Sequence, residues 1–149
     1  MEKLFNTSLG LKLSTEQIVT ELIRFMRADE QRRYKVTIGS DSELGANGAA
    51  DFVTAIVIHR VGNGGRYFWR RLMPAKRFHT LRDRILNEVL MSLAVANEFL
   101  AAARQSQLPT FDFELHVDVG ENGATKSMIQ EVVGMIRAHN FEARTKPDS

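Results

Sequence analysis

The sequence predicts a single α/β domain in which helices pack on a mixed β-sheet. Three strand-like segments follow one another with no helix between them, which is typical of an antiparallel meander. Further along the chain, strand-like and helix-like segments alternate, and this alternation predicts parallel strands joined by right-handed crossovers. The 149 residues are enough for one hydrophobic core, and no internal repeat or proline-rich linker divides them.

The first half of the chain predicts one helix followed by the meander. A helix is expected from about Thr15 to Arg27, because Ser14 and Gln17 form a capping-box pattern and apolar residues follow at helical spacing. Alternating apolar and polar residues predict strands at 34–41, 52–61 and 66–73, with a glycine-rich hairpin loop at 62–65. We therefore expect one domain over residues 1–149, with residues 1–30 as an N-terminal helical extension.

The second half predicts the alternating part of the sheet. A long helix is expected from Thr80 to about Arg104, a fourth strand at 113–119, a helix at 125–139 and a short fifth strand at 141–145. The predicted architecture is thus a mixed five-stranded sheet with helices packed on it.

Composition excludes several classes of protein. The absence of cysteine excludes a disulfide scaffold, a Cys-ligated zinc site, an iron–sulfur cluster and a cysteine nucleophile. The sequence has no GxxxxGK[ST] loop, GxGxxG fingerprint or GxSxG elbow, which argues against the usual triphosphate, dinucleotide and hydrolase sites. Because neither a secretory signal nor a run of about eighteen apolar residues is present, we expect a soluble, cytoplasmic protein.

Two aspartates end predicted strands, and a glutamate lies in the long helix. Strand alternation places Asp41 opposite the apolar face of the first meander strand, and it places Asp118 opposite the apolar face of the fourth. If these strands lie side by side and parallel, both carboxylates emerge at one edge of the sheet. Glu88 lies in a helix that is apolar on two sides, where a carboxylate needs a partner.

These three acids predict a site for hard divalent cations. Mg²⁺ and Mn²⁺ prefer oxygen ligands, and paired ions of this kind support phosphodiester cleavage by activating water. The alternative is that each aspartate is a turn or cap residue and that Glu88 forms an i, i+4 pair with Arg84. The spacing of the acids alone supports the metal-site interpretation and this alternative about equally.

A basic segment favours a polyanionic partner. Residues 66–84 contain seven basic residues and one acidic one, which gives this segment a net charge of +6 in a chain of net charge +2. Aromatic residues interleave with these cations, as in a nucleic-acid groove. The candidate contacts are Arg70, Arg71, Lys76, Arg77 and His79. The alternative is an exposed strand whose arginines keep it soluble while its aromatic residues enter the core.

The order of elements and several segments resemble a known family. The segments are Ile38–Ser42, Arg84–Glu88 with Ser92–Ala94, His116–Gly123, Glu131–Met135 and Lys146–Ser149. Together they resemble the YkuK family of the ribonuclease H-like superfamily. That resemblance implies that Asp41 is the first-strand acid that bridges two metal ions, Glu88 the helix acid and Asp118 the fourth-strand acid. It further implies that Asp148 is the last acid of the site.

The leading hypothesis is a nuclease dependent on Mg²⁺ or Mn²⁺ that acts on RNA, RNA–DNA hybrid or structured DNA. A second hypothesis is a non-catalytic nucleic-acid-binding module on the same fold. A third is a structural or oligomer-forming protein whose acids are simple caps, and the sequence leaves a homodimer open.

Overall fold

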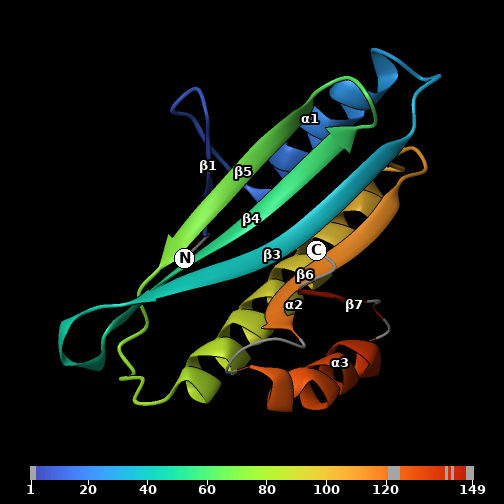
Figure 1. Ribbon diagram of the computed structural model, residues 1–149. Coiled ribbons are helices and arrows are strands. Elements are labelled where there is room, and N and C mark those ends of the chain that lie inside the picture. Colours follow the sequence, from blue (N-terminus) through green and yellow to red (C-terminus); the bar gives the residue numbers. More distant parts are fainter. Residues whose placement is uncertain (1–2, 121–124, 140, 142, 147–149) are drawn as a thin grey trace.

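The computed structural model describes residues 3–120, 125–139, 141 and 143–146 (Figure 1). Its elements in chain order are β1 (Phe5–Thr7), β2 (Lys12–Leu13), α1 (Thr15–Arg27), β3 (Tyr34–Leu44), the 3₁₀ turn η1 (Ala46–Gly48), β4 (Ala50–Arg60), β5 (Gly65–Leu72), α2 (Leu81–Gln105), β6 (Asp112–Gly120), the 3₁₀ turn η2 (Lys126–Met128), α3 (Ile129–Ala138) and β7 (Ala143–Lys146).

The sheet is mixed, as the sequence predicts. Within the described residues it has seven strands in the order β2-β1-β5-β4-β3-β6-β7. Strands β3, β4 and β5 form the antiparallel meander, whereas β6 pairs in parallel with β3 and with β7. The α/β class and the packing of helices on a mixed sheet are confirmed, and the count of five strands is corrected to seven.

The two additional strands lie in the segment that we expected to be a helical extension. β1 is three residues long and pairs with β5, with Asn6 opposite Trp69. β2 is two residues long and pairs only with β1 in the described sheet. Strands this short carry no alternating pattern, because their conformation depends on the neighbouring strand rather than on local sequence.

The boundaries of the helices follow from their caps. In α1, the Ser14 side chain accepts a hydrogen bond from the Gln17 N–H while the Gln17 side chain accepts one from the Ser14 N–H, so the predicted capping box is present. In α2, the Thr80 hydroxyl accepts a hydrogen bond from the Asp83 N–H. These side chains satisfy backbone donors that the first helical turn leaves unpaired.

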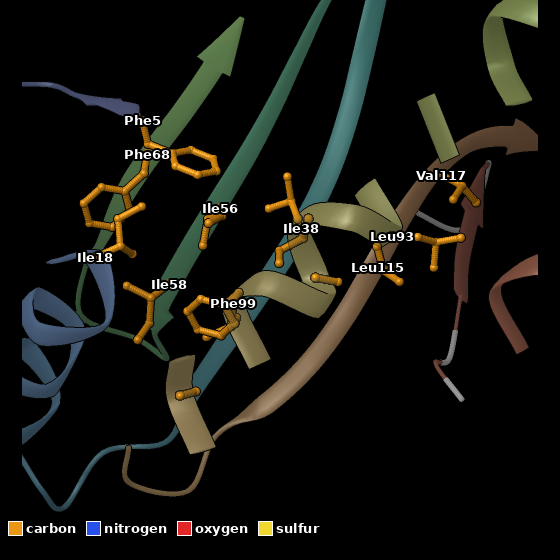
Figure 2. Close-up of a cluster of buried hydrophobic side chains, with 14 of the residues drawn as sticks. Phe5, Ile18, Ile38, Ile56, Ile58, Phe68, Leu93, Phe99, Leu115 and Val117 are labelled. Atoms are coloured by element: carbon orange, nitrogen blue, oxygen red, sulfur yellow. The ribbon is translucent and has the colours of Figure 1, made fainter. Parts of the chain in front are cut away.

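The hydrophobic core lies between one face of the sheet and the helices. In β3 every second side chain from Tyr34 to Ile38 is buried, and so are Ile58 and Ile56 of β4, which lie opposite Val36 and Ile38. Figure 2 shows Ile38, Ile56 and Leu115 from the strands gathered with Leu93 and Phe99 of α2. The opposite face of β3, β4 and β5 carries no helix in the described part of the chain (Figure 1).

Helix α2 is the main core helix. It packs against the sheet and against α1, so it buries residues on two sides, as predicted. The burial is not complete on both sides, because Leu93 is buried whereas Leu90 is 53% exposed. By length and composition alone α2 is long and apolar enough to cross a membrane, and half of its most apolar stretch is buried inside the protein.

Candidate metal centre

The parallel pairing of β3 with β6 stops just before the two strand-end aspartates. The last paired residues are Gly39 and His116, and Asp41 and Asp118 lie two residues beyond them. The pairing of β6 with β7 is also irregular between His116 and Gly120. Beyond this point β3 and β6 diverge, and α2 is visible between them (Figure 1). The equal offset keeps the two aspartates at the same level of the sheet.

The helix-facing side of β3 changes from apolar to polar where the strands separate. The buried positions occupied by Val36 and Ile38 are followed by Ser40 and Ser42. The Ser40 Oγ lies 2.7 Å from the Ser92 Oγ of α2 and 2.7 Å from the Thr54 Oγ1 of β4. These hydroxyl contacts replace apolar packing beneath Asp41 and join β3 to α2 at this end of the sheet.

Glu88 reaches the same place from α2. Its side chain is 3% exposed, and its Oε2 accepts a hydrogen bond from the Ser42 hydroxyl at 2.5 Å. Arg84, which the sequence offers as an i, i+4 partner of Glu88, donates from Nη1 to the Ser42 carbonyl oxygen at 3.1 Å and lies 3.4 Å from the Ser42 hydroxyl. Ser42 therefore links the helix acid to β3 and to the nearest arginine.

The three acids converge on one point. Asp41, Glu88 and Asp118 each offer a carboxylate oxygen, and these three atoms lie within 4.8 Å of one another. The Asp41 side chain is exposed, Asp118 is half-buried and Glu88 is buried, so the cluster extends from the interior to the surface. The Asp41 Oδ1 accepts a hydrogen bond from the Ser42 N–H at 2.9 Å. The second oxygen of Glu88, Oε1, is buried and has no hydrogen-bond partner among the described residues.

In the absence of a cation, the electrostatics of the cluster favour the protonated form of Glu88 below about pH 7. Burial is the largest influence and raises the pKa of the Glu88 carboxyl from 4.5 to about 7. The Ser42 hydrogen bond opposes this shift, the charges of Asp118 and Asp41 add to it, and the charge of Arg84 lowers the pKa by the smallest amount. The cluster thus combines a buried carboxylate oxygen that lacks a hydrogen-bond partner among the described residues with two further carboxylates. Oxygen ligands of this kind are the ones that Mg²⁺ and Mn²⁺ prefer.

The remaining acid predicted for the site, Asp148, lies outside the described residues. The structure therefore brings together three of the four predicted acids.

The two predicted phosphate contacts on β5, Arg70 and Arg71, lie on opposite faces of the sheet. Arg70 points to the helix side, where it is 7% exposed, and its guanidinium carbon lies 4.6 Å from the centroid of the Phe5 ring. Burial lowers the pKa of Arg70, and the neighbouring Glu98, at 3.7 Å, opposes that shift. Because it is covered by β1 and α2, Arg70 is out of reach of a strand lying on the surface. We therefore remove it from the predicted contacts.

The other predicted contacts are accessible. Arg71 lies on the outer face of β5 and pairs with Asp51 of β4 at 3.2 Å. Lys76, Arg77 and His79 are exposed in the connection between β5 and α2. That connection lies beside the turn between β3 and β4, because the Phe78 N–H donates to the Gly48 carbonyl at 2.8 Å. The basic connection is thus at the end of β3 that carries Asp41.

Sequence reasoning did not single out Ser42 or Ser92. The signal available for Ser42 was strand alternation, since it shares the parity of Val36 and Ile38 and so faces the core with a hydroxyl. For Ser92 the signal was its place one helical turn after Glu88 on the buried side of α2.

Comparison with known proteins agrees with the fold. The family model described as ribonuclease H-like matches residues 17–149. The uncharacterized protein YkuK of Bacillus subtilis (strain 168) is 30% identical to the chain over 156 aligned positions, which cover 98% of this chain and 90% of that protein. No solved structure matches the chain significantly. The mixed sheet is consistent with these matches, which show that the chain belongs to the ribonuclease H-like family.

Proposed function

We propose that the chain is a divalent-metal-dependent nuclease that hydrolyses phosphodiester bonds in RNA, RNA–DNA hybrid or structured DNA. The convergence of Asp41, Glu88 and Asp118 supports this proposal most directly. Carboxylates that meet at the end of diverging strands, with one of them buried, need a compensating positive charge. Family membership makes nucleic acid the natural substrate class, although the fold alone does not determine the chemistry.

In this proposal the chain's own residues hold and orient the ions. Glu88 presents Oε1 while Ser42 fixes its Oε2, so one oxygen is positioned and the other is left for a ligand. Asp41 and Asp118 contribute oxygens from the two strand ends. Bound Mg²⁺ or Mn²⁺ would supply Lewis-acid stabilisation of the phosphate and a water activated for attack. Asp148 remains the proposed fourth acid.

The basic residues near the carboxylates have a separate role in this proposal. Lys76, Arg77 and His79 are exposed beside the tip of the β3–β4 turn, and Arg71 is exposed on the outer face. Cations at these positions would hold the phosphates that flank the cleaved bond.

A cleavage assay tests the proposal. End-labelled RNA, RNA–DNA hybrid and branched DNA are incubated with Mg²⁺, Mn²⁺ or EDTA and the products are separated by size. We expect cleavage with either ion, none in EDTA, and none in Asp41→Asn or Asp118→Asn. The matched control is Asp112→Asn, because Asp112 begins the same strand β6 and pairs with Arg33 at the far end of the sheet, 2.9 Å away. Cleavage that persists in Asp118→Asn at the control's rate refutes the proposal.

A second candidate function is binding without cleavage. The accessible Lys76 and Arg77 favour it, because they would attract a polyanion whether or not ions fill the carboxylate cluster. It predicts salt-sensitive binding of every nucleic acid in the assay, no product with any ion, and weaker binding in a Lys76→Ala/Arg77→Ala variant. Binding that is equally strong at low and high salt would contradict it.

A further inference from the structure

The uncovered face of the sheet holds a recess beside the carboxylates. It has a volume of about 320 Å³ and lies over β3, β4 and β5. Gly39 and Ala55, which face each other across β3 and β4, form part of its lining together with Asp41, Tyr67 and Arg71. A volume of this size is at the lower end of the range of small-molecule sites. Asp41 lines the recess and is also one of the three acids of the candidate metal centre, so the recess is continuous with that centre.

Small residues on two strands give the recess its depth. Gly39 adds no side chain to the floor, and a Cβ at this position would make a tight contact of 3.3 Å with the His116 carbonyl oxygen of the neighbouring strand. In the same row across the sheet, Gly39 is opposite Ala55, and Ala55 is opposite Trp69. Side-chain size therefore increases from Gly39 in β3 through Ala55 in β4 to Trp69 in β5. The aromatic side chains of β5 project above a shallow floor formed by the two small residues.

A pair of aromatic side chains, an exposed Tyr67 and a half-buried Trp69, lies at the β5 side of this floor. Tyr67 and Trp69 lie on the same face of β5, and their rings are stacked with centroids 5.3 Å apart and planes inclined by 28°. Tyr67 is 46% exposed, which is a large apolar surface for a residue in a strand. Phe68, between them in sequence, points to the other face and is buried. Strand alternation has therefore placed two of the aromatic residues of this segment outside the core.

The charges around the recess favour a neutral ligand group in its centre. Asp41, Glu43 and Asp51 are part of the lining, and Arg71 is the cation in it. Arg71 lies in the same row as Asp41, two strands away, at roughly 10 Å between Cα atoms. A phosphate would be repelled from the acidic centre and attracted to Arg71. A flat, uncharged base would meet no such penalty and would gain a stacking surface on Tyr67.

We propose that this recess binds one unpaired nucleotide of the substrate, with its base on the Tyr67 ring and a flanking phosphate at Arg71. The inference rests on the proposed function for its choice of nucleic acid as the ligand. It narrows the substrate class to single strands or to unpaired ends and loops, because a base inside a duplex is covered on both faces by its neighbours and cannot stack on a protein ring.

Binding measured in EDTA tests this inference separately from cleavage. Labelled single-stranded RNA, single-stranded DNA and a blunt RNA–DNA hybrid of the same sequence are titrated with the full chain and followed by fluorescence anisotropy. We expect the single strands to bind more tightly than the hybrid. Tyr67→Ala should weaken single-strand binding by roughly 5- to 150-fold, the effect of one stacked base. Tyr67→Phe, which keeps the ring, is the matched control and should bind within about twofold of the wild type.

Trp69 provides a second readout that needs no substitution. It is the single tryptophan of the chain, and its ring stacks on Tyr67. Unlabelled single strands should therefore change the tryptophan fluorescence of the wild-type protein saturably, with the midpoint found by anisotropy, and the blunt hybrid should not. Binding that leaves this fluorescence unchanged, or that is as strong in Tyr67→Ala as in Tyr67→Phe, overturns the inference.

Failure of the inference and failure of the proposed function give different results. If cleavage requires Asp118 but binding does not depend on Tyr67, the inference about the recess is refuted and the proposed nuclease function is supported. If single strands bind in a Tyr67-dependent way but are not cleaved in the presence of either ion, the inference about the recess is supported and the proposed nuclease function is refuted.

Discussion

Replacing Glu88 by glutamine should make the metal-free protein more stable at neutral pH. Burial raises the pKa of Glu88 from 4.5 to about 7, so the folded state holds a proton on this group that the unfolded state releases above pH 4.5. The stability that this group contributes is fully present below pH 4.5 and is lost as the pH rises through about 7. A shift of this size corresponds to about 3 kcal/mol. Glutamine keeps the shape and an acceptor for the Ser42 hydroxyl but has no proton to lose.

The assay is urea unfolding in EDTA at pH 5 and pH 8. Other groups also titrate in this range, so the informative quantity is the difference in unfolding free energy between Glu88→Gln and the wild type at each pH. We expect this difference to move in favour of the variant by about 3 kcal/mol between the two pH values, or by about 6–12 °C in Tm for a chain of this length. Glu21→Gln, an exposed acid on α1, should show no such change. A difference for Glu88→Gln that is the same at both pH values would refute the assignment of a destabilising buried charge.

Three further predictions concern neighbouring parts of the structure. Ser42→Ala removes the hydrogen bond that lowers the pKa of Glu88, so Mn²⁺ affinity at pH 7, measured by calorimetry, should fall about tenfold and recover at higher pH; unchanged affinity would mean that Ser42 does not orient the acid. Ile38→Ala should lower the unfolding free energy by ~2–5 kcal/mol in urea, because Ile38 is fully buried beneath α2. Gly65→Ala should cost ~1–3 kcal/mol in the same assay, since its Cβ would lie 2.5 Å from the Ile58 carbonyl oxygen; wild-type stability would show that the β4–β5 hairpin shifts freely.

Most of the fold was predictable because its long elements carry their own pattern. The alternation in β3 and the capping box before α1 are local, and both are present as predicted. β1 was not predictable, since its three residues are ordered by pairing with β5 rather than by their own sequence. The helix expected at 125–139 begins instead with the 3₁₀ turn η2 before α3. Short elements of this kind depend on contacts that a single sequence does not display.

The candidate site was predictable in its members but not in its geometry. Strand parity placed Asp41 and Asp118 on one face, whereas their closeness to Glu88 depends on where the β3–β6 pairing ends. No local pattern marks that point. Arg70 illustrates the opposite difficulty, because β5 has aromatic residues on both faces and its sequence does not indicate which face is buried. Arg70 is buried and Arg71 is exposed because β1 and α2 cover one face of β5 and leave the other face open.

Simple capping is a poor account of the three acids, because Glu88 is buried in the interior of a helix. A cap or turn carboxylate gains its stability from backbone donors, and Asp41 does accept one such bond from Ser42. Glu88 lies in the interior of α2, far from either helix end, and its Oε1 is buried without a partner among the described residues. In the absence of a cation, this arrangement lowers stability at neutral pH, and neither Ser42 nor Arg84 offsets the effect of burial on its pKa. A divalent ion would supply the missing charge and the missing ligand for Oε1 together, so the same observation that predicts instability without metal predicts stabilisation by metal.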